Sequence, residues 1–457
     1  MALIAAGPVD AQGAKPLAED QAAAKVSVPA RQADAARGAT EAPDAATAAP
    51  TDDAPKNNDA KDAIPAQNAT PSAAPDATEI VEKPAANSRL IVSSWAGAYG
   101  KAQQQAIIEP LTRDLGLAIE RRTHVGGNAA LNTADVAELD QSSLIAACRA
   151  GRLVKMRSLL TSSEYDEAIS AGPDGGDFIA NSVSDCGMPT FAWSSMLIAN
   201  GDAMKKLARR RYKAPTRLAN LLRPKRYPGK RALIRKPRRL LEMMLLGSGI
   251  SRDEVYQVLA TRDGQDQAFK ILDRLSKYIL WVDGPREALI ALDQGNVTMA
   301  MTYSGRAFRR LIASRLLPIW DGHIIDYASW AVPASSENRD NAKQFILAAT
   351  SAESLAAQAR IWPYGPMRRS ALPLARRHDL LDTALDKFMP TSDMRLGQGL
   401  LFDAVFWAEH GAALEDRFAA WLAGVPLGIR VPVPIKAPPP PAASAADEAA
   451  GAAPSQQ

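Results

Sequence analysis

The stretch that decides the fold is WDGHIIDYASW, residues 320–330, which continues into AVP at 331–333. The apolar run LPIW before it predicts a strand that ends at Trp320, and Gly322 predicts a turn that reverses the chain. The following run, which carries Asp326, Tyr327 and Trp330, predicts a second strand. Aromatic rings beside carboxylates suit an ammonium group on an aliphatic stem, because the rings attract a cation and the acids neutralise its charge.

Similar pairs of aromatic and polar residues recur elsewhere in the chain. A tryptophan at a strand end is, taken alone, more typical of a buried core. The recurrence therefore carries the prediction of a ligand site, and the further pairs are Trp281-Val-Asp283, Tyr303-Ser304 and Ser94-Trp95.

The composition indicates a globular protein of ordinary size. The 457 residues are 47% hydrophobic with a net charge of +4, which is enough for two domains. No apolar run approaches the roughly 18–20 residues of a membrane span. The four histidines are scattered, and motifs of metalloproteases, phosphate-binding loops and serine hydrolases do not occur. The sequence thus predicts no catalytic residues, no metal and no cofactor.

The two cysteines, Cys148 and Cys186, leave two interpretations open. In an oxidising compartment they would form one disulfide, and in the cytosol they would be two buried, reduced thiols.

Both ends of the chain have the composition of disordered segments. Residues 1–87 lack Phe, Trp and Tyr, and residues 426–457 form a tail rich in Pro and Ala. Such segments cannot bury enough apolar surface to offset their loss of entropy on ordering. The small-x-small pattern at Val9-Asp-Ala11 indicates the back half of a secretory signal peptide whose start lies upstream, and an ordinary N-terminal arm is the alternative.

The ordered part opens with a strand–helix–strand pattern. Residues 90–92 predict a strand, 101–114 a helix and 117–121 a second strand, which indicates a parallel sheet. Ligands of such sheets bind beyond the carboxyl ends of the strands, so residues 93–99 are predicted at the site. Residues 135–140 predict another strand end, with Glu138 and Asp140 near the same edge.

The segment 205–239 is strongly basic. Three interpretations are open: a solvated basic face, which we favour, a surface for an interaction, and a nucleic-acid site. Base stacking would need interleaved aromatic residues, and only Tyr212 and Tyr227 occur.

The order of motifs resembles the periplasmic solute-binding proteins of ABC transporters, in particular the spermidine/putrescine-binding family. The resemblance covers about residues 88–422. The matching motifs are Ser93-Ser-Trp95-Ala-Gly97-Ala-Tyr99, Cys148-Arg-Ala-Gly151, Asp185-Cys186-Gly187, Phe191-Ala-Trp193-Ser, Tyr227-Pro-Gly-Lys-Arg231, Trp281-Val-Asp283, Tyr303-Ser-Gly-Arg306, Trp320-Asp-Gly322, Ser329-Trp330-Ala-Val-Pro333 and Pro363-Tyr-Gly-Pro366.

The resemblance implies a type II periplasmic-binding-protein fold. It is an α/β fold of two lobes, each a mixed, mostly parallel sheet flanked by helices, which close on a ligand. We expect lobe I to comprise 88–192 and 303–362, and lobe II to comprise 193–302 and 363–425. The resemblance further implies a disulfide between Cys148 and Cys186 and a periplasmic location. It also implies that the protein has no catalytic activity, is a monomer and has the permease subunits of a transporter as partners.

A polyamine such as putrescine or spermidine is the ligand that the resemblance implies. Many members carry an acid two residues before the Trp of the SWAVP-like segment, where this chain has Ala328, and Asp326 lies two residues earlier. The expected ligand-binding residues are Ser94, Trp95, Tyr99, Glu138, Asp140, Trp281, Asp283, Tyr303, Ser304, Asp326, Trp330 and Tyr364.

Two alternatives remain open at this point. A protein of the same fold would bind an anionic ligand through the helix start at 97–100 and Arg306. A sensor module would hand its ligand to a membrane kinase in place of a permease. We expect no nucleic acid as a partner.

Overall fold

We describe the protein from a computed structural model, which places residues 89–124, 128–170, 176–179, 182–209, 213–313 and 315–424. All of them belong to one unit, Ile80–Gln457. The predicted arm at 1–87 and the tail at 426–457 lie outside the described residues, as does Tyr212 of the basic segment.

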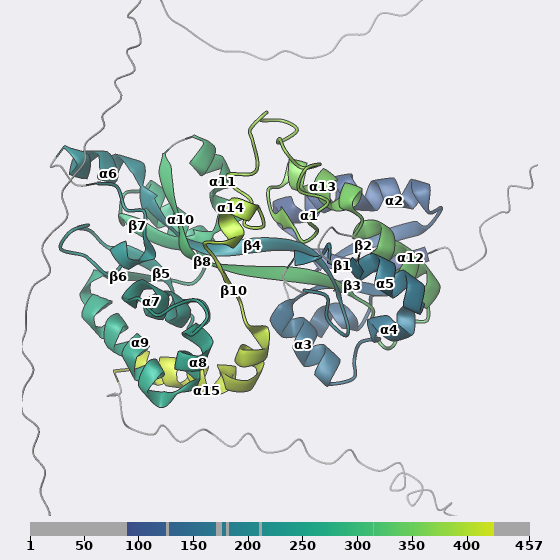
Figure 1. Cartoon of the computed structure of the whole chain (residues 1–457), viewed down its shortest axis with the longest axis horizontal. Helices are drawn as coiled ribbons and strands as arrows, with labels where there is room; N and C mark the ends of the chain where they lie inside the picture. Colours follow the sequence, from purple (N-terminus) through teal and green to yellow (C-terminus); the bar gives the residue numbers. More distant parts are fainter. Residues whose placement is uncertain are drawn as a thin grey trace, which may run out of the picture. The chain divides into compact units, whose positions relative to one another are not determined.

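The secondary structure alternates between strands and helices (Figure 1). The strands are β1 (Arg89–Trp95), β2 (Ala118–His124), β3 (Val136–Asp140), β4 (Met188–Asn200), β5 (Arg231–Ile234), β6 (Ile279–Val282), β7 (Met299–Tyr303), β8 (Leu316–Ala331), β9 (Gly365–Pro366) and β10 (Leu400–Leu401). The α-helices are α1 (Gly97–Gln103), α2 (Glu109–Asp114), α3 (Gln141–Arg149), α4 (Met156–Leu159), α5 (Ser162–Ser170), α6 (Gly201–Ala208), α7 (Leu240–Ser248), α8 (Val255–Ala260), α9 (Arg262–Leu275), α10 (Pro285–Asp293), α11 (Ser304–Ile312), α12 (Arg339–Ala349), α13 (Ala352–Ile361), α14 (Asp393–Leu396) and α15 (Ala404–Leu422). Shorter helical turns are η1 (Gln104–Ile108), η2 (Asn128–Leu131), η4 (Leu218–Asn220) and η5 (Ser276–Tyr278).

The strands form one sheet that has two parallel halves. Its order is β2-β1-β3-β8-β4-β7-β5-β6, with β10 beside β8 and β9 beside β4. Strand β1 is parallel to β2 and β3, and β5 is parallel to β6 and β7. The long strands β4 and β8 are antiparallel to each other and run from one half to the other across the centre of the molecule (Figure 1). The predicted two-lobed α/β fold and its parallel opening unit are confirmed.

The predicted chain reversal at Gly322 is wrong, because β8 continues through this residue. Ile319 pairs with Leu197 and Ile324 pairs with Ser195, so β8 bulges between its two pairs. Gly322 sits at the bulge with a φ of 67°, and its N–H bonds to the carbonyl oxygen of Gln398 at 3.0 Å. A bulge at a glycine absorbs the irregularity without ending the strand. One strand therefore serves both lobes.

Each half of the sheet has its own apolar core. One core includes Leu90, Val136 and Trp330, and the other includes Leu233 and Phe269. The two cores meet along β8, since Ile324 belongs to the second core and the next residue, Ile325, to the first. Buried side chains between 367 and 389 pack into the first core, although the sequence boundaries assign this segment to lobe II.

A disulfide joins Cys148 to Cys186, as the resemblance implied. Their Cα atoms lie 5.9 Å apart, and the bond ties the end of α3 to the turn before β4. Cys186 is buried in a small apolar cluster with Leu144 and Leu153. The bond closes a long loop and thereby restricts the unfolded chain.

Replacing both cysteines by alanine should lower the stability of the protein. The bridge spans 38 residues, and the chain-entropy relation assigns such a loop about 4 kcal/mol of stabilisation. Denaturant unfolding of the wild-type protein and of the Cys148→Ala, Cys186→Ala variant measures the difference. Reducing the wild-type protein should reproduce the loss. Two free thiols in unreduced, denatured wild-type protein would contradict the assignment.

Candidate functional site

A cavity of about 620 Å³ lies where strand ends of the two lobes meet. Trp95 and Asp140 end β1 and β3 in one lobe, while Tyr303 ends β7 in the other and Arg239 follows β5. Carboxyl ends of parallel strands are the usual position of ligand sites in such sheets. The cavity is lined by Trp95, Ala96, Tyr99, His124, Asp140, Ser142, Phe191, Trp193, Lys236, Arg238, Arg239, Tyr303, Arg306, Ala328 and Tyr364. Its size is that of a small-ligand site.

Aromatic rings form one wall of the cavity. The ring of Tyr99 lies 5.5 Å from that of Tyr364 and 6.2 Å from that of Phe191, and Trp193 lies 6.2 Å from Tyr364. Tyr364 packs against the backbone of Gly305, where an added Cβ would come within 2.1 Å of the tyrosine ring. Glycine at this position thus lets the ring reach the cavity. The wall gives an apolar surface for the stem of a ligand.

Glu138 lies beneath this wall. The carboxylate is fully buried and accepts hydrogen bonds from the Tyr99 hydroxyl at 2.5 Å, from Thr190 at 2.8 Å and from Gln103 at 2.9 Å. Burial raises its pKa, and these three hydrogen bonds oppose the shift. Glu138 fixes the orientation of Tyr99 and does not itself line the cavity. Glu138 was predicted to contact the ligand directly, and here it holds Tyr99, which lines the cavity.

Basic side chains form a second group in the lining, which we call the basic side of the cavity. Lys236, Arg238 and Arg239 come from the loop after β5, and Arg306 comes from the first turn of α11. Among the described lining residues, Asp140 is the one acid. The cavity thus carries an excess of positive charge.

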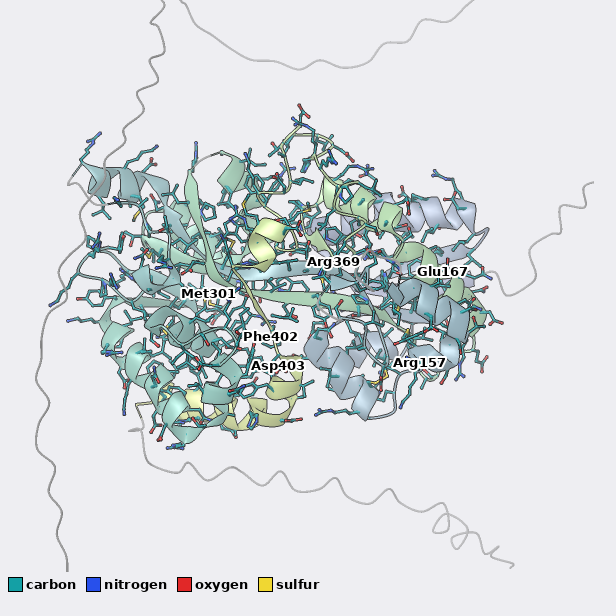
Figure 2. All side chains as sticks on the ribbon, viewed as in Figure 1. Arg157, Glu167, Met301, Arg369, Phe402 and Asp403 are labelled. Atoms are coloured by element: carbon teal, nitrogen blue, oxygen red, sulfur yellow. A yellow bond between two sulfur atoms is a disulfide. The ribbon has the colours of Figure 1, made fainter. Side chains whose placement is uncertain are left out.

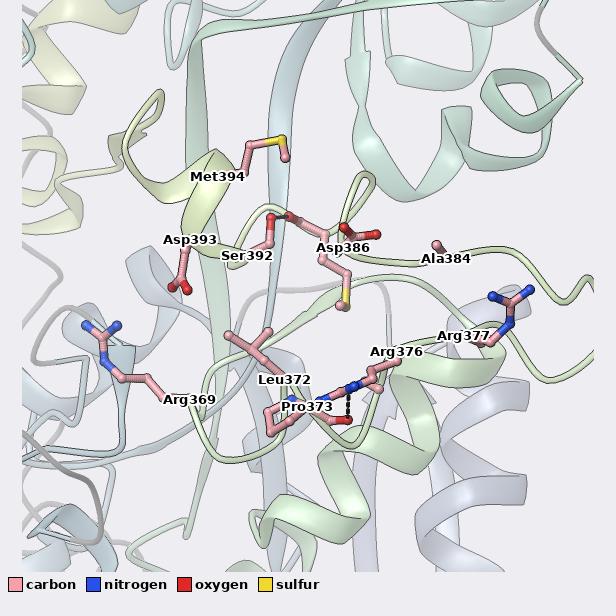
Figure 3. Close-up of a pocket in the computed structure, with 12 residues that line it drawn as sticks. Arg369, Leu372, Pro373, Arg376, Arg377, Ala384, Asp386, Ser392, Asp393 and Met394 are labelled. Atoms are coloured by element: carbon pink, nitrogen blue, oxygen red, sulfur yellow. Dashed lines mark hydrogen bonds between the residues drawn. The ribbon is translucent and has the colours of Figure 1, made fainter.

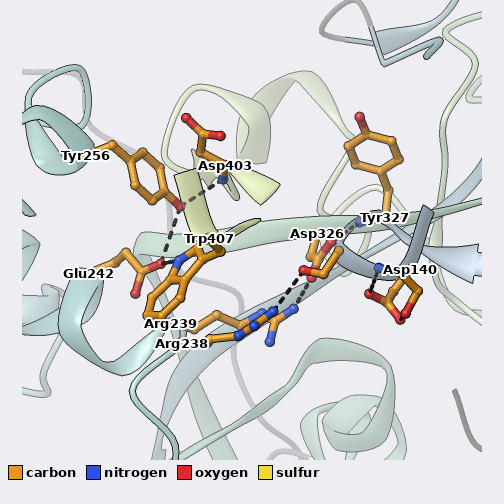
Figure 4. Close-up of polar contacts among 11 residues, drawn as sticks. Asp140, Arg238, Arg239, Glu242, Tyr256, Asp326, Tyr327, Asp403 and Trp407 are labelled. Atoms are coloured by element: carbon orange, nitrogen blue, oxygen red, sulfur yellow. Dashed lines mark hydrogen bonds and ion pairs between the residues drawn. The ribbon is translucent and has the colours of Figure 1, made fainter. Parts of the chain in front are cut away.

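Asp326 is engaged by the protein itself. Its carboxylate forms an ion pair with Arg239, and the two side chains are 2% and 17% exposed (Figure 4). The Tyr327 N–H also donates to Asp326, at 2.8 Å. Burial raises the pKa of Asp326, and Arg239 opposes that shift. The arginine thus already neutralises this carboxylate, and the expected contact of Asp326 with a ligand amine stays a prediction.

The same ion pair holds Arg239 in an unusual backbone conformation. Its φ of 68° is left-handed, which costs a residue with a side chain free energy and persists where the surroundings impose it. The guanidinium lies 4.5 Å from the ring centroid of Phe402. Figure 2 labels Phe402 and Asp403 just before α15. Although burial opposes the shift, the carboxylate of Asp326 keeps the pKa of Arg239 above its ordinary value. Arg239 is therefore charged and fixed at the edge of the cavity.

The neighbouring Arg238 connects the two lobes at the cavity. It donates to Ser142 at 3.1 Å and to Glu415 at 2.9 Å, and its guanidinium lies 5.4 Å from the ring of Trp407. Ser142 belongs to α3, whose first N–H groups lie beside Asp140. This contact joins the loop after β5 to the helix after β3.

Asp140 has a fixed position at the start of α3. It accepts from the Ser143 N–H at 3.1 Å and from the Ser143 hydroxyl at 2.9 Å, which is the geometry of a helix N-cap. The carboxylate also lines the cavity, facing the basic side. It is the one described acid placed to meet a ligand cation there.

Several predicted contacts lie away from the cavity in the buried structure. Trp330 is fully buried and packs on Phe345, with ring centroids 5.3 Å apart. The Ser94 hydroxyl accepts from Arg121 at 2.9 Å, and the Ser304 hydroxyl accepts from the Ser194 N–H at 3.1 Å. These three residues stabilise the elements around the site.

The pair Trp281 and Asp283 also lies elsewhere. Trp281 packs against Phe418 and Trp421, at ring distances of 5.9 and 6.1 Å. Asp283 is exposed and pairs with Arg235 at 2.6 Å. Trp281 lies on β6, at the edge of the sheet, and Asp283 directly follows that strand; neither lines the cavity.

Five of the predicted residues therefore line the cavity together, namely Trp95, Tyr99, Asp140, Tyr303 and Tyr364. Glu138 and Asp326 lie directly behind lining residues, which they contact, and the other predicted residues do not line the cavity. Ala96 lies within the stretch 93–99 that was predicted at the site. The residues that our sequence reasoning missed are His124, Ser142, Phe191, Trp193, Lys236, Arg238 and Arg239. One signal for the basic members was present, because they directly follow the apolar strand at 232–234. We had assigned them to a solvated face.

A second hollow, of about 820 Å³, lies along the segment 369–394 (Figure 3). Its lining includes Arg369, Arg376, Asp386 and Asp393, and Arg376 donates to the carbonyl of Pro373 at 3.1 Å. It contains none of the predicted residues and none of the aromatic ones. We therefore assign the ligand site to the cavity between the strand ends.

The fold and this cavity define a two-lobed solute-binding protein. Residues 124–379 match the sequence model of the family described as bacterial extracellular solute-binding protein, so the chain belongs to that family. Its members bind solutes and are not enzymes, and the chain is the substrate-binding component of an ABC transporter.

Comparisons with individual proteins agree with this assignment. The γ-aminobutyric acid-binding protein of Pseudomonas aeruginosa is 30% identical over 343 residues, covering 73% of this chain and 91% of that protein. An ABC transporter substrate-binding protein from Bradyrhizobium japonicum has a similar structure, with a TM-score of 0.62, 22% identity, and coverage of 74% of this chain and 100% of the other. A γ-aminobutyric acid receptor structure gives a TM-score of 0.58, with 22% identity and 73% and 97% coverage.

Two kinds of feature are absent from the described residues. None of the helices placed there is long and apolar enough to cross a membrane. No group of three or more His, Cys, Asp or Glu side chains that could hold a metal ion occurs in the same ranges.

Glu242 lies behind the basic side of the cavity, in the first turn of α7. It is fully buried, and its carboxylate accepts from the Trp407 indole at 2.6 Å and from the Tyr256 hydroxyl at 3.4 Å (Figure 4). Burial raises its pKa to about 7, against an ordinary value of 4.5. Between these values the folded protein holds a proton that the unfolded chain has released.

The free energy of unfolding should therefore contain a term from Glu242 that is lost as pH rises from about 4.5 to about 7. The term is about 3 kcal/mol, since one pKa unit corresponds to about 1.4 kcal/mol. Glu242→Gln should remove it, because an amide still accepts from Trp407 and does not ionise. Denaturant unfolding at pH 5 and pH 8 measures the effect, with Glu287→Gln, an exposed change on α10, as the control. Equal pH slopes in wild type and Glu242→Gln would contradict the assignment.

Proposed function

We propose that this protein captures a small amino acid that carries separate ammonium and carboxylate groups, of the γ-aminobutyrate type, and delivers it to an ABC permease. The observation that carries the proposal is the charge of the cavity. Among its described lining residues, Lys236 and Arg306 form no ion pair with a described acid, and Asp140 is the one acid. The other two cations are already paired, Arg238 with Glu415 and Arg239 with the buried Asp326.

The basic side of the cavity suits a carboxylate. Arg306 is exposed on α11, and Lys236 is exposed in the loop after β5; neither forms an ion pair with a described acid. Arginine and lysine donors bind carboxylates through charge-assisted hydrogen bonds, which are stronger than neutral ones. Arg239 contributes less to this side, because its guanidinium is paired with Asp326.

The ammonium group of the ligand is assigned to the other lobe. Asp140 supplies a negative charge whose position is fixed by its bonds to Ser143. Trp95 lies near it in the lining, and an aromatic face attracts a cation. The aromatic wall then contacts the aliphatic stem between the two charged ends.

Polyamines fit this cavity less well. Putrescine carries two ammonium groups, and the cavity offers one described acid for them. Ala328, which occupies the position of an acid in many polyamine-binding relatives, lines the cavity and adds no charge. Like charges at close range repel, and low polarity strengthens that repulsion. We therefore replace the expected polyamine by an amino acid.

Kinship supports this choice. The relative from Pseudomonas aeruginosa, which is 30% identical over most of its length, is a γ-aminobutyric acid-binding protein. We further propose that the protein acts in the periplasm as a monomer and that permease subunits are its partners.

A thermal-shift series with matched four-carbon ligands tests the proposal. γ-Aminobutyrate should raise the melting temperature, since a ligand at 100 times its Kd adds about 2.7 kcal/mol. Butyrate lacks the ammonium and butylamine lacks the carboxylate, so each should give a smaller shift than γ-aminobutyrate. Putrescine, with two ammonium groups, should give the smallest. A larger shift with putrescine than with γ-aminobutyrate would overturn the proposal and restore the polyamine.

A further inference from the structure

A second basic hollow lies in lobe II and shares no lining residue with the ligand cavity. Its volume is about 690 Å³, and it is formed by the chain around 219–226, by Gly247 near the end of α7, and by the end of α9 with η5. Five cations line it, and none of the described lining residues is an acid. The cations, all exposed, are Arg223, Lys225, Arg226, Arg274 and Lys277.

A sixth positive charge lies next to this hollow. Arg231, on β5, is fully buried and donates to the carbonyl oxygens of Leu221 and Gly229. The ion pairs found within the described ranges give it no carboxylate partner, and its Nη2 atom has no hydrogen-bond partner there. Tyr278, which interacts with Arg231, lines the hollow. The buried guanidinium therefore adds to the positive potential at this place.

Helix α9, whose end forms part of this hollow, has cations near its start that are neutralised by an acid. Near the start of α9, Asp266 pairs with Arg262 at 3.5 Å and also with Arg417. At the other end of α9, Arg274 has no ion pair with a described acid. The negative end of the helix dipole stabilises cations such as Arg274 and Lys277.

The dipole does not account for the remaining three cations. Arg223, Lys225 and Arg226 lie in the turn after η4, outside any described helix. Like charges gathered around one hollow repel each other, and a bound anion removes that repulsion. Arginine and lysine together are the side chains that bind phosphate groups.

We propose that this hollow is a binding site for a phosphate-bearing anion, independent of the amino-acid cavity. The phosphate comes either from a soluble polyphosphate or from the headgroup of an anionic phospholipid. Both sources present the same chemistry to Arg223, Arg226 and Lys277. The second source would hold lobe II against a membrane surface, where a partner permease resides.

The test uses the full chain and two probes. Sodium pyrophosphate is titrated by calorimetry, and vesicles of phosphatidylcholine with or without phosphatidylglycerol are used in a co-sedimentation assay. The variant Arg226→Glu, Lys277→Glu reverses two charges of the hollow. The matched control, Lys155→Glu, Lys206→Glu, makes the same change in net charge at exposed lysines outside the hollow.

At least one probe should bind the wild-type protein, and the hollow variant should bind it at least about tenfold more weakly, since each basic residue contributes roughly a fivefold factor at an anionic surface. The control variant should stay within about twofold of wild type. Pyrophosphate binding without vesicle binding assigns the site to a soluble anion, and the reverse assigns it to a headgroup. The proposal is overturned if neither probe binds wild type, or if both variants lose the same affinity, because net charge alone would then explain binding. γ-Aminobutyrate shifts, measured in parallel, show whether the variants are folded without bearing on this outcome.

Discussion

The buried ion pair between Arg239 and Asp326 determines the character of the ligand cavity. Asp326 lies on β8, the strand that both lobes share, and Arg239 begins α7 in lobe II. Breaking a buried pair leaves one desolvated charge, which is strongly destabilising, so the two residues hold each other in place. This pairing removes from the site the carboxylate that a cationic ligand would have needed. It also fixes an arginine, in a left-handed backbone conformation, at the cavity edge.

Much of the fold was predictable from local patterns. Strands β1 and β2 and the helical stretch between them follow from the pattern of residues 90–121, and the order of motifs identified the two-lobed arrangement. The turn expected at Gly322 failed because a glycine after a strand indicates either a reversal or a bulge, and only the pairing partner decides. Here β4 continues alongside on both sides of the glycine, so the strand goes on.

The candidate site was predicted less completely. Trp95 and Asp140, at the ends of the first predicted strands, were found because ligands of parallel sheets bind beyond the carboxyl ends of the strands. That rule needs only the positions of the strands in the sequence. Trp330 was assigned to the site because the sequence does not show which face of β8 meets the core. The basic residues 236–239 were missed for a related reason. A run of charged residues is typical of a solvent-exposed surface, and the sequence does not show that the other lobe packs against it. Pairings between distant residues, such as Arg239 with Asp326, leave no local signal.

Calorimetry with γ-aminobutyrate and butyrate on two variants tests most directly which ligand charges the cavity binds and in which direction the ligand lies. Asp140→Asn keeps an oxygen for the cap on Ser143 and removes the charge. It should weaken γ-aminobutyrate binding at least about tenfold, by the loss of a charge-assisted contact, and leave butyrate unchanged. Arg306→Gln should weaken both ligands, and Arg309→Gln, exposed on the same helix, should weaken neither. If Asp140→Asn leaves γ-aminobutyrate binding unchanged, or if Arg306→Gln strengthens either ligand, the proposed carboxylate-binding basic side and ammonium-binding acid are contradicted.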